Sequence, residues 1–382
     1  MANYDYEIIN GRKIRVRPKE TVSEIDKNGY FRRQPNHFTT PFGDGENDLK
    51  AEGNKRYRLV WAKLCHWSNR AAIVRELEGL EDQISVNMVK HAPHEKNLGW
   101  EYVYNENNID PVLGDQFLSE AYYRADDDYQ GRTTVPALID TTTGKVVNND
   151  YNWLTTYFEV NFRPWHKKGA PELYPVELRE EIDKMNLWLF DNINNAVYRS
   201  SFSRSNEGHF DGVNTFYAAM DRLEKRLETN RFLFGDYVTD SDIRLYVTLA
   251  RLDIRYTAQL GETKRPLYTY KNLWGYAKEL WEIPAFAHHT DFAAIIRQGR
   301  IEGEEDGFRA STHYDLALPK IDWDAQWKVS TERAYLSSDP THPIYLGNNR
   351  RFDIDPTWYD LGAESPKKEE KETPPSCGCF CG

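Results

Sequence analysis

The chain has 382 residues, of which 40 % are hydrophobic, and this size favours two or three domains around a sizeable core. Its formal net charge of −11 argues against a general nucleic-acid binder, because such proteins need basic surfaces to displace counterions. The sequence has no apolar run of about 18 residues, and its start has no basic-then-apolar signal pattern. We therefore expect a cytoplasmic protein with no membrane or nucleic-acid partner.

The first elements alternate between extended and helical patterns. Residues 1–55 have weak periodicity and many turn residues, so we expect an irregular N-terminal extension. Residues 57–64 are short, apolar and aromatic, which predicts a buried strand. The next segment, HWSNRAAIVRELEGLE, has apolar residues at helical spacing, and Gly79 is placed to end that helix. Residues 84–91 alternate apolar and polar side chains and predict a second strand.

The middle of the chain predicts a helix and a hairpin. Residues 92–130 are long for a loop, so we expect a helix at about 113–125. Residues 135–139 and 145–147 flank a Thr-Gly turn, which is typical of a β-hairpin. From residue 152 the pattern becomes helical.

The second half is helical in pattern from about residue 175. The segment TDSDIRLYVTLARLDIRY begins with an approximate capping box, in which Thr239 is followed by Asp242. We expect NLWGYAKELWEI to be the last clear helix, ending before Pro284. The order of elements predicts a small α/β domain followed by an all-α domain. The expected parts are an N-terminal extension (1–55), an α/β domain (56–165), a helical domain (175–300), a C-terminal extension (301–362) and a disordered tail (363–382).

The cysteines are few and unevenly placed. Cys377, Cys379 and Cys381 lie in the tail and make an incomplete metal site, so we predict no metal centre. The remaining one, Cys65, excludes a disulfide within the body of the chain. Cys65 lies where a strand is expected to end and a helix to begin, so helix N–H groups should lower its pKa. Packing alone is the alternative role for this residue.

Two nearby positions limit and extend this chemistry. Ser68 stands three residues after Cys65, so an internal dithiol is excluded and a mixed disulfide would need an external thiol. Arg70 is basic and close enough in sequence to favour a thiolate.

Val135 precedes Pro136, and a cis bond there would expose its backbone to an extended ligand, although X-Pro pairs are common. Asp150 lies at a predicted helix start, where it would cap the helix or hold a ligand ammonium.

Several segments, in order, resemble the glutathione-transferase superfamily. RYRLVWAKLCHWSNRAAIVRELEGLE looks like the segment that carries C-P-W-A in glutathionyl-hydroquinone reductases, the Xi-class transferases. GRTTVPALID, VVNNDY, INNAVYRSSF and FLFGDYVTDSDIRLYVTLARLDIRY resemble further segments of that family. The resemblance spans about residues 30–300. It implies a thioredoxin-like N-terminal domain, an all-helical C-terminal domain, and removal of glutathione from glutathionyl-hydroquinones.

The resemblance also implies roles for single residues. Cys65 would be the nucleophile that forms a mixed disulfide with glutathione, the co-substrate. Tyr198 and Tyr256 would contact the hydroquinone oxygens. The residues implied to bind the thiol tripeptide are Trp100, Arg132, Val135, Asp150 and Tyr151. Arg132 would hold a carboxylate of the tripeptide, Val135 would pair with it through its own backbone, and Asp150 would receive the γ-glutamyl ammonium.

Two substitutions depart from the family pattern. His66 replaces a proline, and its charge could help or hinder the thiolate. Tyr151 replaces a serine, so another low-molecular-weight thiol, such as γ-glutamylcysteine, is an alternative to glutathione. A general thiol transferase that deglutathionylates disulfides, and a non-catalytic binding module of the same fold, remain alternative functions. We expect a homodimer from the resemblance alone.

Overall fold

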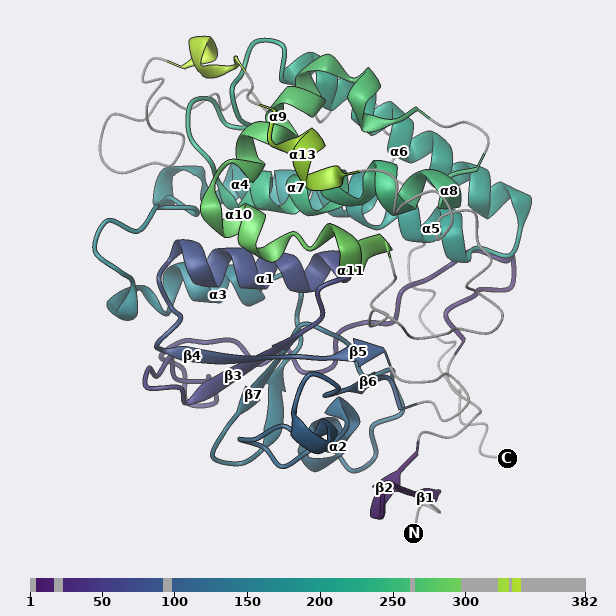
Figure 1. The fold of residues 1–382 in the computed structure, drawn as a ribbon, viewed down its shortest axis with the longest axis vertical. Helices are drawn as coiled ribbons and strands as arrows, with labels where there is room; N and C mark the ends of the chain where they lie inside the picture. The colour runs from purple at the N-terminus through teal and green to yellow at the C-terminus, as the bar shows by residue number, and fades with distance from the viewer. Residues whose placement is uncertain are drawn as a thin grey trace, which may run out of the picture.

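The computed structural model describes residues 5–16, 23–91, 98–261, 265–296, 322–329 and 332–337. An α/β unit is built around a four-stranded sheet, and a helical unit lies against one side of it (Figure 1). The predicted tail, 363–382, and most of the predicted C-terminal extension lie outside the described residues.

The sheet has the strand order β4-β3-β7-β8. Strand β3 (Tyr57–Trp61) pairs in parallel with β4 (Ile84–Met88) and antiparallel with β7 (Ala137–Asp140). Strand β8 (Lys145–Asn148) closes the predicted hairpin with β7. All five residues of β3 are buried, as expected for a central strand covered on both faces.

Helices cover both faces of this sheet (Figure 1). Leu59 of β3 belongs to the core on the side of α1 (His66–Leu77) and α3 (Leu154–Val160). Val60 belongs to a second core beneath α2 (Leu118–Ala125). Neighbouring residues point to opposite faces of a strand, so this one strand anchors both layers.

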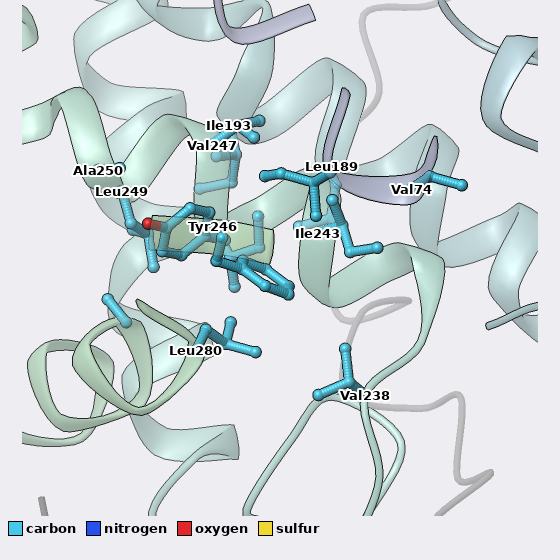
Figure 2. Packing of buried hydrophobic residues seen from close by; sticks show 14 of the residues in the cluster. Val74, Leu189, Ile193, Val238, Ile243, Tyr246, Val247, Leu249, Ala250 and Leu280 are labelled. Atoms are coloured by element: carbon cyan, nitrogen blue, oxygen red, sulfur yellow. The ribbon is translucent and has the colours of Figure 1, made fainter. Parts of the chain in front are cut away.

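Helix α1 is the layer between the sheet and the helical unit. Every residue of α1 except Glu76 is buried, because α3, α7 and α10 all pack against it. Helix α7 (Asp240–Arg251) is buried along its whole length, and its apolar side chains meet those of α1 and α4 in one cluster (Figure 2). The other elements of the helical unit are α4 (Arg179–Leu189), a π-helical turn η5 (Phe190–Asn194), α5 (Ala196–Phe202), α6 (Asn206–Arg226), a π-helical turn η6 (Leu252–Tyr256), α8 (Thr257–Gln259), α9 (Lys271–Trp281), α10 (Pro284–His289), α11 (Phe292–Ile296) and α13 (Trp323–Trp327).

The remaining elements are short. They are the strands β1 (Tyr6–Ile9), β2 (Arg12–Arg15), β5 (Lys90–His91) and β6 (Trp100–Glu101), and the 3-10 turns η2 (Glu106–Asn108), η3 (Arg163–Trp165), η4 (Val176–Leu178), η7 (Leu267–Thr269) and η9 (Ala334–Leu336). Among the described residues, no helix combines the length and the apolarity needed to span a membrane.

Most predicted elements are confirmed, and the capping box of α7 is present. The helix expected at 113–125 begins later, at Leu118. The carboxylate of Asp110 accepts the N–H groups of Val112 and Leu113, which forms a turn there, and Gly114 has a positive φ of 73°. Glu120 then accepts the N–H of Phe117 at 3.0 Å and caps α2 from within.

Three other expectations need correction. The strand expected at 57–64 ends at Trp61, because the chain turns so that the Cys65 N–H donates to Ala62 O at 3.0 Å. The helix in NLWGYAKELWEI ends before Pro284 as expected but is not the last one, because Pro284 begins α10 at a position that needs no N–H donor. The extension expected to be irregular contains the β1–β2 hairpin, which Arg15 ties to Asp127 at 2.8 Å.

Candidate active site

Cys65 occupies the N-cap position of α1, at the turn that follows β3. Its backbone is extended (φ −84°, ψ 121°), and its carbonyl accepts the first helical hydrogen bond from Asn69 N–H at 3.0 Å. The thiol is partly exposed, and its Sγ lies 3.6 Å from the carbonyl oxygen of Val135. It makes no hydrogen bond to the N–H groups of the first turn. The sulfur is thus reachable at the helix start that the sequence predicts.

A buried arginine from the helical unit holds the segment around this cysteine. Arg251 donates from Nε to Leu64 O at 3.0 Å and from Nη2 to Lys63 O at 3.2 Å, and it also contacts Asn69. Burial lowers the pKa of Arg251, while nearby Tyr256 and Cys65 favour its charged form. Arg251 therefore fixes the turn and places positive charge beside the thiol.

Tyr198 and Tyr256 lie on the helical side of the same site. Their ring centroids are 6.5 Å apart, and the Tyr256 hydroxyl lies 3.2 Å from Nδ1 of His66, the residue after Cys65. Burial raises the pKa of both phenols, and negative charge on Cys65 raises both further, against the opposing effect of Arg255. Both tyrosines therefore stay protonated at neutral pH and can donate hydrogen bonds.

Each of these tyrosines follows or ends a π-helical turn. The turn η5 precedes α5, which carries Tyr198, and the turn η6 ends at Tyr256. A π-helical turn adds a residue to the helix and changes where the following side chains point, and such turns are frequent at functional sites. Helical periodicity alone does not predict this local change.

The residues implied to bind the thiol lie on the other side of Cys65. The Val135–Pro136 bond is cis. The indole N–H of Trp100 donates to Thr133 O at 3.1 Å. Asp150 is buried, and its Oδ1 accepts hydrogen bonds from Asn36 Nδ2 and from Asn152 N–H, both at 2.9 Å.

Arg132 is already paired within the chain. Its Nε and Nη2 donate to the two carboxylate oxygens of Glu24 at 2.8 and 2.9 Å, and its backbone N–H donates to Gln34 Oε1 at 2.8 Å. Burial alone would raise the pKa of Glu24, but Arg132, the Gln34 N–H and Arg33 together outweigh this effect and the pKa is lowered. Residues 24–36 of the extension therefore contact two residues implied to bind the thiol, Arg132 and Asp150.

The comparisons with known proteins agree with this arrangement. Residues 197–279 match the family model described as Glutathione S-transferase, C-terminal domain. The chain is 35 % identical over 280 residues to Glutathione S-transferase omega-like 2 of Schizosaccharomyces pombe, and the match covers 70 % of this chain and 88 % of that relative. The chain belongs to the glutathione S-transferase family.

Two further matches refine the relationship. Glutathionyl-hydroquinone reductase YqjG of Escherichia coli is 33 % identical over 240 residues, covering 63 % of this chain and 73 % of the relative. The solved structure of YqjG with glutathione bound has a TM-score of 0.61 at 32 % identity, covering 70 % of this chain and 87 % of that one. These findings confirm the family resemblance and the fold of a glutathione transferase.

The structure bears on the expectations for two further residues of this transferase. Arg70 is buried, and the charged groups that act on it include Arg244, Asp240 and Glu159. Burial lowers the pKa of Arg70 to about 9. Asp150 does not cap α3, because that helix begins at Leu154 with Trp153 at its N-cap.

Tyr151 packs in an aromatic group. Its ring centroid lies 4.6 Å from that of Trp67, and it stacks on Phe190 at 6.0 Å. Burial raises the pKa of the Tyr151 phenol. Where the family resemblance implies a serine hydroxyl, this chain therefore has a buried aromatic ring.

Arg33 is a candidate site residue that sequence reasoning missed. Its guanidinium lies 4.5 Å from the ring centroid of Tyr198 and 5.1 Å from that of Trp67, and its Nε donates to Asn195 Oδ1 at 2.9 Å. The only sequence signal is the pair of arginines in GYFRRQ, in a segment without periodicity.

Within the part of the chain that the structure describes, no group of His, Cys, Asp and Glu could hold a metal ion.

Proposed function

We propose that this chain catalyses the glutathione-dependent reduction of glutathionyl-hydroquinones to hydroquinones. A partly exposed cysteine and two protonated tyrosines lie at the boundary between the α/β and helical units, and this arrangement is the main support for the proposal. The name of the E. coli relative, with which this chain shares a third of its residues over the matched region, supports the same reaction.

The proposed first step transfers the glutathionyl group to Cys65. The Cys65 thiolate attacks the sulfur that links glutathione to the aromatic ring, and an S–S bond forms. The ring-carbon–sulfur bond breaks, its electron pair goes to the carbon, and that carbon takes up a proton. The products are the hydroquinone and a mixed disulfide between Cys65 and glutathione.

The second step restores the enzyme. A second glutathione attacks the mixed disulfide as a thiolate, forming oxidised glutathione and releasing the Cys65 thiolate. Two glutathione sulfurs are oxidised to one disulfide and the ring carbon is reduced, so the electrons balance. Ser68 in place of a second cysteine requires that this thiol come from solution.

The tyrosines would act on the leaving ring. Negative charge builds on the quinol during cleavage, and a neutral phenol held beside its oxygens stabilises that charge by hydrogen bonding. Both phenols keep their protons at neutral pH, as this role needs. We assign Tyr198 and Tyr256 to this role, in the helical domain of about residues 175–300.

The α/β domain, of about residues 56–165, would hold the thiol. We assign Trp100 to packing beside glutathione and the backbone of Val135 to pairing with it. Arg132 would receive a carboxylate and Asp150 the γ-glutamyl ammonium. Glutathione is favoured over another small thiol because the related YqjG structure contains it.

Steady-state turnover tests the proposal. The protein is incubated with a glutathionyl-hydroquinone and excess glutathione, and hydroquinone release is followed by chromatography. Wild type should turn over, and Cys65→Ser should fall to the background rate because a serine cannot form the disulfide intermediate. Equal turnover by wild type and Cys65→Ser contradicts the mechanism.

The same cysteine would serve a general thiol transferase, so both substrate classes belong in the assay. The aromatic group of Trp67, Tyr151 and Tyr198 favours a flat ring substrate, because aromatic side chains pack well against planar rings. We expect kcat/KM to be higher for a glutathionyl-hydroquinone than for a glutathionylated peptide disulfide. The reverse order would favour the general transferase.

We further propose that the protein is a cytoplasmic homodimer. The support is its family membership, since glutathione transferases are typically dimeric. Light scattering coupled to size-exclusion chromatography should give twice the chain mass of 44.7 kDa. A mass equal to one chain contradicts the dimer.

A further inference from the structure

His66 is a polar residue completely enclosed between the thiol and the two tyrosines. Its exposed fraction is 0 %. Its ring centroid lies 4.2 Å from that of Trp67 and 5.2 Å from that of Tyr198. Its Nδ1 lies 3.2 Å from the Tyr256 hydroxyl and 3.3 Å from Thr248 Oγ1. The C-P-W-A pattern of the family has proline at this position, so the imidazole is a departure from that pattern.

The surroundings of His66 favour the neutral form of its imidazole. Burial lowers its pKa well below the value of a free imidazole, and Arg251, Arg33, Arg255 and Arg70 lower it further. His66 is therefore neutral at physiological pH, and only one of its two ring nitrogens carries a proton. Which nitrogen is protonated decides the direction of its hydrogen bonds.

The contacts of the ring favour a proton on Nδ1. Two oxygens lie near Nδ1, whereas Nε2 is buried and has no partner among the described residues. A proton on Nε2 would bury an unpaired N–H, which is rarer in proteins than an unpaired acceptor. With the proton on Nδ1, the imidazole donates and the Tyr256 oxygen accepts.

The hydroxyl of Tyr256 then has its own proton left to donate. The Tyr256 ring lies 6.5 Å from that of Tyr198, centroid to centroid, on the helical side of the site. In a buried site, a hydrogen bond accepted by a hydroxyl strengthens the one that it donates. The remaining Tyr256 proton is then available to a bound ring oxygen.

We propose that His66 is a positioning residue: it donates a hydrogen bond to Tyr256 and so directs the proton of that tyrosine toward a quinol oxygen. This inference rests on the proposed function. It gives the departure from C-P-W-A a role in the cleavage step. His66 does not touch the reacting sulfur, and it acts through Tyr256.

Two variants of matched size test the idea. His66→Asn keeps a polar amide where Nδ1 stands, and His66→Leu has nearly the same shape without a donor. His66→Leu should lower kcat for a glutathionyl-hydroquinone roughly tenfold, because one buried hydrogen bond is lost from the transition state. His66→Asn should retain activity to within about threefold, and KM should change less than kcat in both variants.

Two further measurements separate positioning from structural damage. Exchange of Cys65 with a small disulfide, which has no ring oxygen, should run at the wild-type rate in both variants. In a Tyr256→Phe background, His66→Leu should cause little further loss, because its effect passes through Tyr256. Thermal melting of each variant checks that it is folded.

The outcomes are distinct. The inference is overturned if His66→Leu matches wild type, if His66→Asn falls as far as His66→Leu, or if small-disulfide exchange is lost in His66→Leu. Additive losses with Tyr256→Phe also overturn it. If wild type exchanges the small disulfide but releases no hydroquinone, the proposed function itself fails and the inference fails with it.

Discussion

At the residue scale, the buried imidazole of His66 ties part of the stability of the protein to pH. In the unfolded chain, a histidine titrates near pH 6.5. In the folded protein, burial and the surrounding arginines lower the pKa of His66 well below that value. Below about pH 6.5 the unfolded chain therefore binds a proton that the folded protein does not, which favours unfolding.

We predict that this contribution can be measured. As pH falls from about 6.5, His66 should lower the free energy of unfolding by up to about 1.4 kcal/mol per pH unit. His66→Asn should lack this component. Urea unfolding of both proteins between about pH 7 and 5 gives the difference in unfolding free energy. Parallel curves for the two proteins would contradict the assigned burial of a neutral imidazole.

The positions of the site residues could be predicted from the sequence to different extents. Cys65 could be placed because the strand before it and the helix after it are both encoded by local patterns. Arg251 and Arg33 could not be placed, because their contacts come from segments far away in the chain. Arg251 lies at the end of α7 and reaches Leu64, and Arg33 reaches Asn195. No periodicity reports such a pairing.

At the element scale, the N-terminal extension contacts two of the residues that we propose bind the thiol. Glu24 is largely buried and pairs with Arg132 through both of its carboxylate oxygens. Asn36 of the same segment bonds Asp150. The segment has no helical or strand pattern, so its course over the α/β unit could not be predicted from the sequence.

We predict that Glu24→Gln lowers the KM for glutathione. The charged partner of Arg132 is removed, and the guanidinium becomes more available to the ligand carboxylate. Because the Arg132 side chain is 43 % exposed, solvent screens the pair and the effect should be only about 2- to 5-fold. Glu46→Gln, at an exposed position of the same extension, is the matched control. An increased KM in Glu24→Gln would show that Glu24 instead orders Arg132 for the ligand.

The start of α7 is an element that the sequence does encode. The capping box formed by Thr239 and Asp242 is present, and the Asp242 carboxylate also accepts Leu233 N–H at 2.9 Å and the Tyr276 hydroxyl at 2.8 Å. The sequence suggested the two local bonds. It gave no sign of the two distant ones.

Removing this carboxylate should be strongly destabilising. Asp242→Ala leaves several buried donors without an acceptor, so we predict a loss of roughly 3 kcal/mol or more in unfolding free energy. Glu228→Ala, at an exposed position after α6, is the control and should change the stability by less than about 0.5 kcal/mol. A similar small loss for both variants in urea titrations would contradict this role of Asp242.

At the scale of the whole molecule, the α/β and helical units share one apolar cluster. Leu59 and Ile73 of the α/β unit belong to the same cluster as Leu249 and Leu280 of the helical unit. Figure 2 shows part of this cluster, with Val74 of α1 near residues of α7. The site lies at this shared boundary: Cys65 comes from one unit and Tyr256 from the other. Its geometry therefore depends on the two units staying together.

We predict that the two units unfold as one. Tryptophan fluorescence and far-UV circular dichroism should give coincident urea transitions. Ile73→Ala in α1 and Leu249→Ala in α7 should each lower the free energy of unfolding by about 2–5 kcal/mol, with the same value from both probes. Two separated transitions, or a shift confined to one probe, would contradict a shared core.

The proposed reaction passes through one bond, between the sulfur of Cys65 and that of glutathione. A single turnover measures it directly: a variant with serine at 377, 379 and 381 is mixed with a glutathionyl-hydroquinone and no free thiol, then acid-quenched. Intact mass should show one glutathionyl group per chain, mapped to the Cys65 peptide, with one hydroquinone released per adduct. Hydroquinone released without an adduct, or an adduct without hydroquinone, would contradict the account.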